Sequence, residues 1–528
     1  MEWLTLDAQG EAVTLAPEEL GATAYAGAPT WSRWETAPGR CRCVAVRETP
    51  YWVQALWEVP GFGRVWLTAD RDGDGWSEEG GPLVLLPLAF ARTQLRRAQA
   101  RAAQLVQQGE AAPLQAQERL TSAARVLEQA ETASTPAEQA RAAHAALADA
   151  LWAGEGIVLA QAQRALARMA QERRARLRLG CQAFRLAQMP AEQRALFFDL
   201  FTAVTLPFYR ATLEPEEGRL DWTPRDRLLD VLAGAPRPVM AKGHPLIWLH
   251  RAGLPAWMAG LPYERLVPVL RRQIRETVER YRGRIRVWDI INEAHHLTDG
   301  GRHPHSANIP NLTREQLLDL TALAAIEVGA ADPQAVRVIN MNDPFRRTRA
   351  RIERPEAETW DGEAYLADVI ARGIPFEVIG VQWYTGAGRE YCRDFLTVAE
   401  QLERYCALAR RAGKVVHITE AQVPSADQPD PQSVVYRWAV EAGRPALAPS
   451  ATAGWWHRPW DKEVQADWAE AFYTLCLAQP EVEVVTWWDF ADPGFWPWGG
   501  MLDRAGAPKP IYYRLRALAA KIWAEAGS

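Results

Sequence analysis

The pattern of hydrophobic and polar positions changes twice along the chain, which predicts three successive regions. Residues 1–89 hold short alternating runs separated by Gly and Pro, as at 51–59 and 64–69, and such runs are typical of β-strands joined by tight turns. Residues 90–176 are rich in Ala, Gln, Arg and Leu with helical spacing. From 177 to 528, apolar runs of strand length alternate with amphipathic segments of helix length.

The alternation in the third region predicts a (β/α)8 barrel, in which eight parallel strands are each followed by a helix. We place the strands near residues 180–184, 199–204, 237–242, 284–292, 335–340, 376–382, 413–419 and 482–488. The predicted fold class is therefore α/β: a TIM barrel over 177–528, preceded by a small β-sandwich over 1–89 and an Ala-rich helical segment over 90–176.

Breaking and capping signals divide the helical segment. Gly109–Pro113 breaks the first helix, and Thr135-Pro-Ala-Glu138 is a capping box with Pro at the first helical position. Gly154-Glu-Gly156 is predicted to break the chain again, which gives four helices. We expect these helices either to brace the barrel or to form a contact between copies of the chain, and the pattern favours neither.

Two of the predicted barrel strands end in a glutamate. The run Val287–Ala294 places Glu293 at the end of the fourth strand, and Gly413–Glu420 places Glu420 at the end of the seventh. Catalytic groups of such barrels sit at the carboxyl ends of the strands, and glycoside hydrolysis needs one carboxyl as proton donor and another as nucleophile or base. The alternative for each residue alone is a glutamate that forms an ion pair or caps a helix.

The composition adds one signal and excludes several function classes. A formal net charge of -5 and 48% hydrophobic residues, with no basic stripe, P-loop or dinucleotide fingerprint, give no support for a nucleic-acid, membrane or cofactor role. The 24 Trp exceed both the 13 Tyr and the 13 Phe, and indoles can stack on sugar rings. In the sandwich, Trp57, Trp66 and Trp76 could form a sugar-binding face, but we expect core or interface positions.

Motifs at successive strands then carry a family resemblance. They are Gly243-His-Pro-Leu-Ile-Trp248, Trp288-Asp-Ile-Ile-Asn-Glu-Ala294, Ile418-Thr-Glu420 and Thr486-Trp-Trp-Asp-Phe-Ala-Asp492 followed by Trp496, with Gln465-Ala466 and Pro508-Lys-Pro510 in the last helix and tail. In this order they resemble glycoside hydrolase family 10, whose best-known members are endo-β-1,4-xylanases. The resemblance covers about two thirds of the chain.

The resemblance implies a retaining β-glycoside hydrolase that cleaves β-1,4-xylan or xylo-oligosaccharides by double displacement. Glu293 would be the general acid/base and Glu420 the nucleophile, about 5 to 5.5 Å apart, and Asn292 would bind the 2-hydroxyl of the sugar. The further sugar-binding residues that it implies are His244, Trp248, Gln382, Trp488 and Trp496.

Departures from the family pattern put the specificity in doubt. The loop after the second strand lacks the family's Asn and Lys, and Tyr209 or Arg210 is the candidate substitute. Tyr384 stands where the family has a His beside the nucleophile, and a tyrosine can donate a hydrogen bond but carries no positive charge. Asn340, Asn342 and Asp343 resemble an Asn-Asp pair that would order the loops. The segment 454–460 could line a subsite or pack against the helices.

Alternatives remain open for function and partner. The same two glutamates would serve a retaining β-glycosidase or transglycosidase of other specificity, and a barrel without activity could bind carbohydrate, with the sandwich as its binding module. The predicted partner is in each case a β-linked polysaccharide or oligosaccharide, and we expect no metal and no cofactor.

Three smaller features complete the sequence-based expectations. The six cysteines lack metal-ligand spacing and are expected to be free thiols. Asp70–Gly75 resembles the start of a calcium loop, but the twelfth position is Gly81 rather than Glu, so we favour an acidic β-turn. The first residues lack a basic start and an apolar run, so we expect a cytoplasmic protein or one whose secretion signal is not part of this sequence.

Overall fold

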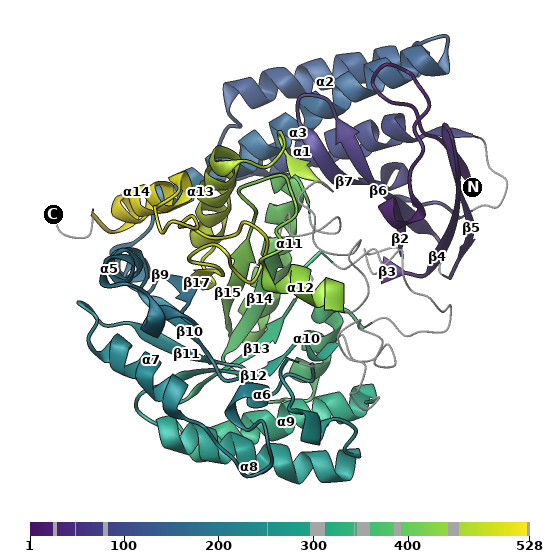
Figure 1. Ribbon diagram of the computed structural model, residues 1–528. Coiled ribbons are helices and arrows are strands. Elements are labelled where there is room, and N and C mark those ends of the chain that lie inside the picture. The colour runs from purple at the N-terminus through teal and green to yellow at the C-terminus, as the bar shows by residue number, and fades with distance from the viewer. Residues whose placement is uncertain are drawn as a thin grey trace.

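The computed structural model describes most of the chain (Figure 1). The described residues are 1–24, 29–47, 49–77, 83–250, 252–295, 312–342, 344–345, 360–384, 392–441 and 454–524. Asp343 and Gly81, which the sequence analysis singled out, lie outside them. No helix in these ranges is both long and apolar enough to cross a membrane.

The eight predicted barrel strands are all present, and they close into a parallel barrel in the order β10-β11-β12-β13-β14-β15-β17-β9. Their bounds are β9 (Arg178–Gln182), β10 (Ala203–Pro207), β11 (Met240–His244), β12 (Val287–Asn292), β13 (Val336–Met341), β14 (Val378–Tyr384), β15 (Val415–Gln422) and β17 (Val482–Trp487). The second strand begins later than predicted because the apolar run before it belongs to helix α5 (Ala191–Leu200). The TIM-barrel prediction is confirmed.

Helices alternate with the strands and surround the barrel (Figure 1). The long ones are α7 (Thr223–Ala233), α8 (Tyr263–Tyr281), α9 (Arg314–Ala331), α10 (Gly362–Ala371), α11 (Phe395–Ala412), α13 (Lys462–Ala478) and α14 (Pro510–Ala524). Two shorter helices lie in loops at the site described below: α6 (Arg210–Leu213) after β10, and α12 (Val434–Glu441) between β15 and β17.

The N-terminal region is built from two packed sheets. One has the strand order β4-β5-β1-β8, and the other β16-β7-β6-β2-β3. Their bounds are β1 (Glu2–Leu4), β2 (Leu20–Ala24), β3 (Pro29–Thr30), β4 (Ser32–Ala37), β5 (Arg40–Val46), β6 (Tyr51–Val59), β7 (Gly63–Ala69), β8 (Val84–Leu85) and β16 (Trp455–Trp456). The ring of Trp3 in the first sheet lies 6.5 Å from that of Tyr51 in the second. Trp57, Trp66 and Trp76 are buried, as core residues are expected to be.

Strand β16 comes from the barrel region, not from the N-terminal region. Trp455 and Trp456 pair antiparallel with Arg64 and Gly63 of β7. The segment 454–460 therefore packs the barrel against the N-terminal sheet, a position that neither stated alternative named. Trp456 and His457 also bind Glu155 in the helical segment, as the alternative of packing against the helices expects. A sequence pattern cannot reveal the pairing of β16 with β7, because the partners are about 390 residues apart.

Three long helices lie side by side along one edge of the barrel (Figure 1): α1 (Leu86–Gln107), α2 (Leu114–Thr132) and α3 (Pro136–Ala167), followed by the short α4 (Gln171–Arg174). The capping box at Thr135 is present. The predicted break at Gly154–Gly156 is wrong, because α3 continues through it. Gly154 serves close packing instead, since a Cβ there would lie 3.0 Å from Leu396 of α11.

Ion pairs and one buried carboxylate join these helices to the barrel. Arg97 and Arg101 of α1 bind Glu400 and Glu403 of α11, each at 2.5 Å. Glu155 of α3 is buried and accepts hydrogen bonds from the backbone N–H of Phe395 (2.8 Å) and the indole of Trp456 (2.9 Å). Its other oxygen is hydrogen-bonded to His457 Nε2 at 2.8 Å. The helical segment therefore braces the barrel, and an additional role between copies of the chain stays untested.

The remaining small predictions concern the cysteines and the acidic loop. All six cysteines are buried free thiols, as predicted. In the loop that begins at Asp70, this carboxylate accepts from Thr93 at 2.8 Å and forms an ion pair with Arg96. Both carboxylate oxygens of Asp70 are thus bound by side chains of α1.

Candidate active site

Glu293 and Glu420 both lie at the carboxyl end of the barrel, as predicted from their strands. Glu293 directly follows β12, and its backbone is in the left-handed region at φ 56°. Its N–H donates to the carbonyl of Asn340 at 2.9 Å, which holds this conformation. Residues other than Gly in that region are strained, and such strain gathers at functional sites. Glu420 lies inside β15, next to a register irregularity between Ile418 and Ala421 that re-aims the side chains.

Two donors orient the Glu293 carboxylate. Trp248 Nε1 donates to Oε2 at 3.1 Å, and Gln382 Nε2 donates to Oε1 at 3.0 Å. The same Gln382 nitrogen also donates to Asn292 Oδ1 at 3.1 Å. Trp248, Gln382, Asn292 and Glu293, which the sequence analysis selected from three different strands or their loops, are therefore joined by hydrogen bonds. The Glu293 side chain is half-buried.

Glu420 is buried and has different partners. The Tyr384 hydroxyl donates to Oε2. Asn340 Nδ2 donates to Oε1 at 3.4 Å, and its own oxygen accepts from Thr419 at 2.6 Å, which fixes the orientation of the amide. His244 Nε2 lies 3.8 Å from Oε1. Tyr384 thus takes the position beside Glu420 that the resemblance gave to a histidine.

Burial dominates the ionisation of Glu420. The pKa of Glu420 is raised to about 8, chiefly by loss of hydration and also by the negative charges of Glu293 and Asp289. The Tyr384 hydrogen bond and the charge of Lys242 oppose this shift by stabilising the ionised form. The two carboxyl groups are therefore electrostatically coupled, and their protonation is set by the groups around them.

A buried charge cluster lies beneath the two glutamates. Asp289 of β12 accepts from Lys242 Nζ at 2.8 Å and is hydrogen-bonded to His244 Nδ1 at 2.6 Å. Burial opposes its ionisation, but Lys242 and His244 outweigh burial and lower the pKa of Asp289. Burial also lowers the pKa of His244, which favours the neutral imidazole. The bond from Asp289 to Nδ1 therefore fixes the orientation of the imidazole ring, with Nε2 turned toward Glu420.

Aromatic side chains surround the two carboxylates. The Tyr209 ring lies 5.7 Å from His244 and 5.5 Å from Trp248. Trp488 lies 5.6 Å from His244, and Trp496 lies 4.6 Å from Tyr384. The predicted aromatic residues are thus brought together at one face of the site.

Arg210, a predicted site residue, binds Glu214 and has no contact with the two glutamates among the described residues. Its guanidinium forms a buried ion pair with Glu214, whose carboxylate also accepts from Gln273 at 3.1 Å. Of the two candidates for the substituted loop after β10, Tyr209 is therefore the one in contact with other site residues. The sugar-binding role of Arg210 stays a prediction that these contacts do not support.

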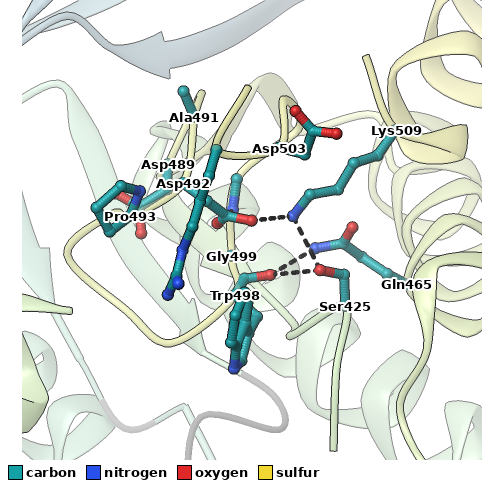
Figure 2. A network of polar contacts seen from close by, with 12 residues as sticks. Ser425, Gln465, Asp489, Ala491, Asp492, Pro493, Trp498, Gly499, Asp503 and Lys509 are labelled. Carbon is teal, nitrogen blue, oxygen red and sulfur yellow. Dashed lines mark hydrogen bonds and ion pairs between the residues drawn. The ribbon is translucent and has the colours of Figure 1, made fainter. Parts of the chain in front are cut away.

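Hydrogen bonds to the loop after β17 fix Trp496. The backbone N–H groups of Phe495 and Trp496 both donate to the Asp489 carboxylate at 2.9 Å. Farther along the loop, Lys509 forms a buried ion pair with Asp492 and donates to Ser425 Oγ at 2.8 Å (Figure 2). These buried bonds hold the loop, and with it Trp496, against the end of β15.

The sequence analysis missed several residues of this site. Lys242 and Asp289 are charged residues inside apolar strands, and this contrast is a signal that could have identified them. Phe184 and Phe495 also contact site aromatics, and Trp438 contacts Phe495, but no pattern distinguishes these three from core residues.

Comparisons with known proteins are consistent with this geometry. A family model described as "Glycosyl hydrolase family 10" matches residues 208–518. The chain is similar to Endo-1,4-beta-xylanase B of Thermotoga neapolitana, with 24% identity over 320 residues that cover 58% of this chain and 77% of the relative. It is 27% identical over 225 residues to Endo-1,4-beta-xylanase C of Paenibacillus barcinonensis, covering 39% of this chain and 19% of that relative.

Solved structures resemble the chain as well. A structure described as GH10 from Paenibacillus barcinonensis aligns with 21% identity and a TM-score of 0.48, covering 66% of this chain and 97% of that one.

Proposed function

Because this chain belongs to glycosyl hydrolase family 10 and is a glycoside hydrolase, we propose that it cleaves β-1,4-xylan or xylo-oligosaccharides with retention of anomeric configuration. The observation that carries the proposal is the pair of differently solvated carboxyl groups, Glu293 and Glu420, at the ends of the fourth and seventh barrel strands. Xylan is the proposed substrate because both relatives described above are named endo-1,4-β-xylanases.

Glu420 is the proposed nucleophile. It is buried and held by Tyr384 and Asn340, so its reactive oxygen is confined to a small range of positions. In the first step it attacks the anomeric carbon, and the bond to the leaving oxygen breaks as a covalent glycosyl-enzyme forms. The Tyr384 and Asn340 hydrogen bonds stabilise the carboxylate before attack and when it leaves again.

Glu293 is the proposed acid/base. It donates its proton to the leaving oxygen in the first step and takes a proton from water in the second. Its half-buried position leaves it open to a leaving group and to water, whereas Trp248 and Gln382 fix its two oxygens. Once Glu420 is bonded to the sugar, its negative charge is gone, and this favours the ionised form of Glu293 that the second step needs.

The surrounding residues are proposed to bind the sugar before the cleavage point. Asn292 and His244 offer polar atoms to its hydroxyls, and Tyr209, Trp488 and Trp496 offer aromatic faces. The buried indole N–H of Trp488 has no hydrogen-bond partner among the described residues. Buried polar groups are normally satisfied, so a sugar hydroxyl is a fitting partner.

The experiment that tests this function compares the intact protein with Glu420→Ala and Glu293→Ala on an aryl β-xylobioside and on xylan. We expect the intact protein to cleave both, and Glu420→Ala to lose activity on both. Glu293→Ala should keep more activity on an aryl substrate with a good leaving group, because such a group needs no proton. Added azide should rescue the two variants with opposite anomeric outcomes, an α-glycosyl azide from Glu420→Ala and a β-glycosyl azide from Glu293→Ala. An intact protein that binds but does not cleave these substrates would contradict the proposal.

A further inference from the structure

Two aromatic side chains meet across the mouth of the barrel. His250 lies in the loop after β11, and Trp438 lies on α12, between β15 and β17; their ring centroids are 5.7 Å apart. In the closed strand order, β11 and β15 are separated by three strands on either side. They are thus opposite walls of the barrel, and the contact between His250 and Trp438, hereafter the bridge, spans its carboxyl end.

The bridge is linked to both catalytic candidates. On one side, His250 stacks on Trp248 with centroids 4.3 Å apart and planes 13° apart, and Trp248 donates to Glu293. On the other side, aromatic contacts lead from Trp438 to Glu420. They run through Phe495 at 5.3 Å, Trp496 at 5.6 Å and Tyr384 at 4.6 Å, and Tyr384 donates to Glu420. The bridge therefore passes beside the place where the bond would be cleaved.

Further aromatic contacts complete a closed circuit on the side of the first two strands. Starting from Trp248, the circuit continues through Tyr209 at 5.5 Å, Phe184 at 5.6 Å and Trp488 at 5.5 Å. From Trp488 it returns to Phe495 at 6.4 Å. These separations are those of aromatic rings in contact. Tyr209 and Trp488 are among the residues proposed to bind the sugar before the cleavage point, so the circuit includes part of that proposed sugar site.

Backbone hydrogen bonds hold both ends of the bridge. The N–H groups of Val434 and Val435, at the start of α12, donate to Gly494 (3.3 Å) and Phe495 (3.0 Å) in the loop after β17. On the other side, the N–H of Ala252 donates to His250 Nδ1 at 3.1 Å, and His250 is only 5% exposed. The bridge is thus a packed contact between two anchored segments.

A bridge in this position determines which part of a glycan can reach the two glutamates. The interior of a long chain would have to be laid across the mouth from above, and the bridge obstructs that approach. A chain end can instead enter beneath it. We propose that the bridge makes this chain act at the ends of its glycan, releasing short products, rather than within the chain; the inference rests on the proposed function.

The test compares bond cleavage with loss of viscosity in soluble xylan, because interior cuts reduce viscosity quickly and end-directed cuts do not. We expect the intact protein to release reducing sugar with little loss of viscosity. Trp438→Ala and His250→Ala open the bridge from opposite sides. Each should raise the viscosity loss per bond cleaved, and the ratio of xylan to aryl β-xylobioside activity, by about tenfold, because each removes a steric barrier that discriminates between substrates.

Val440→Ala provides the matched control. It truncates an exposed side chain (47%) on the same helix as Trp438 and should leave both ratios at the value of the intact protein. His250→Ala is tested beside Trp438→Ala because His250 lies outside α12. A loss of activity caused by misfolding of α12 in Trp438→Ala would therefore not affect His250→Ala.

The outcomes separate this inference from the proposed function. If the intact protein cleaves the aryl substrate but thins xylan as fast as an interior-cutting enzyme does, the inference fails and the function stands. Unchanged ratios in both bridge variants also contradict the inference. If the intact protein cleaves no β-xyloside at all, the proposed function fails, and the inference falls with it.

Discussion

At the scale of single residues, the most informative departure from the family pattern is Tyr384, which stands where the family has a histidine. A tyrosine hydroxyl can stabilise the Glu420 carboxylate by one hydrogen bond, but it adds no positive charge. The positive charge nearest in the network is Lys242, which acts on Glu420 through space while it binds Asp289. The Glu420 carboxylate is thus stabilised by two groups, the Tyr384 hydroxyl and the more distant Lys242 ammonium group, instead of by one charged neighbour.

Tyr384→Phe should therefore change the pH dependence of catalysis. Burial raises the pKa of Glu420 to about 8, and the Tyr384 bond counteracts that shift. Without the bond the pKa rises further, so the acidic limb of kcat/KM should move to higher pH, because the nucleophile must be ionised. At neutral pH, kcat/KM on an aryl β-xylobioside should fall about tenfold or more, as expected when a charged hydrogen bond is lost.

The same pKa shift has a consequence for stability. Glu420 holds its proton more tightly in the folded state than its ordinary value of 4.5 would allow, so its contribution lowers the stability as pH rises from about 4.5 to about 8. Tyr384→Phe should extend this loss to higher pH, because it raises the pKa of Glu420 in the folded state further. Tyr513→Phe, which changes an exposed tyrosine on α14, is the control for both measurements. An unshifted acidic limb in Tyr384→Phe would show that the hydrogen bond does not tune Glu420.

Where a motif combines with a strand end, the residues selected from the sequence lie together in the structure, and their roles stay predictions. Glu293, Asn292, Gln382 and Trp248 come from three different strands or their loops, and three hydrogen bonds connect them. Arg210 was selected only as a substitute for the family's Asn and Lys in the loop after the second strand, and its guanidinium is bound to Glu214 instead. Loop position does not determine which way a long side chain turns, because that depends on a partner elsewhere in the chain.

At the scale of elements, the loop after β17 is held by an unusual buried ion pair. Lys509 and Asp492 are both buried, and Ser425 accepts a further hydrogen bond from Lys509 (Figure 2). The backbone N–H of Gly500 donates to Asp492 at 2.8 Å. A buried pair of this kind contributes little net stability by itself, but the removal of one partner leaves the other charge buried alone.

Lys509→Met should therefore destabilise the protein by about 3 kcal/mol, because it leaves the Asp492 carboxylate buried without its cation. It should also lower activity, since the loop carries Trp496. The double variant Lys509→Met/Asp492→Leu should recover part of the lost stability. Urea unfolding of the two variants and of Asp492→Leu closes a double-mutant cycle. A coupling energy near zero would contradict the structural role given to the pair.

Element positions were predicted well where the hydrophobic period was unambiguous. The eight barrel strands follow from apolar runs separated by helical periods. The continuation of α3 through Gly154–Gly156 was not predictable, because the advantage of Gly154 is its close contact with Leu396, which lies 242 positions away in the chain. Strand β16 was missed for the same reason: two residues form a strand only because β7 offers them an edge.

At the scale of the whole molecule, the helical segment and the N-terminal sheet are integrated with the barrel. Glu155 connects three parts at one point: α3, the start of α11, and the 454–460 segment that extends the N-terminal sheet. These three parts lie far apart in the sequence. We therefore expect the chain to unfold as one cooperative unit.

Glu155→Ala tests this integration. It leaves the indole of Trp456 and the backbone N–H of Phe395 buried without an acceptor, so it should lower the free energy of unfolding by about 3 kcal/mol. Asp149→Ala on the same helix removes a more exposed ion pair with Arg119 and should cost under about 1 kcal/mol. Urea unfolding followed by tryptophan fluorescence measures both. Equal effects of the two substitutions would show that Glu155 does not join the regions.

The proposed mechanism depends above all on Glu420 as the nucleophile of a retaining hydrolase. The most direct measurement is to incubate the protein with a 2-deoxy-2-fluoro-β-xylobioside that carries a good leaving group, and to map the adduct by mass spectrometry. The fluorine slows both steps, and the activated leaving group speeds only the first, so a covalent glycosyl-enzyme accumulates.

We predict one glycosyl adduct, on the peptide that contains Glu420, and none in Glu420→Gln. Glu293→Ala should still form the adduct, because the leaving group needs no protonation. If the protein turns over an aryl β-xylobioside but forms no adduct, or carries the adduct on another residue, the assignment of Glu420 is contradicted.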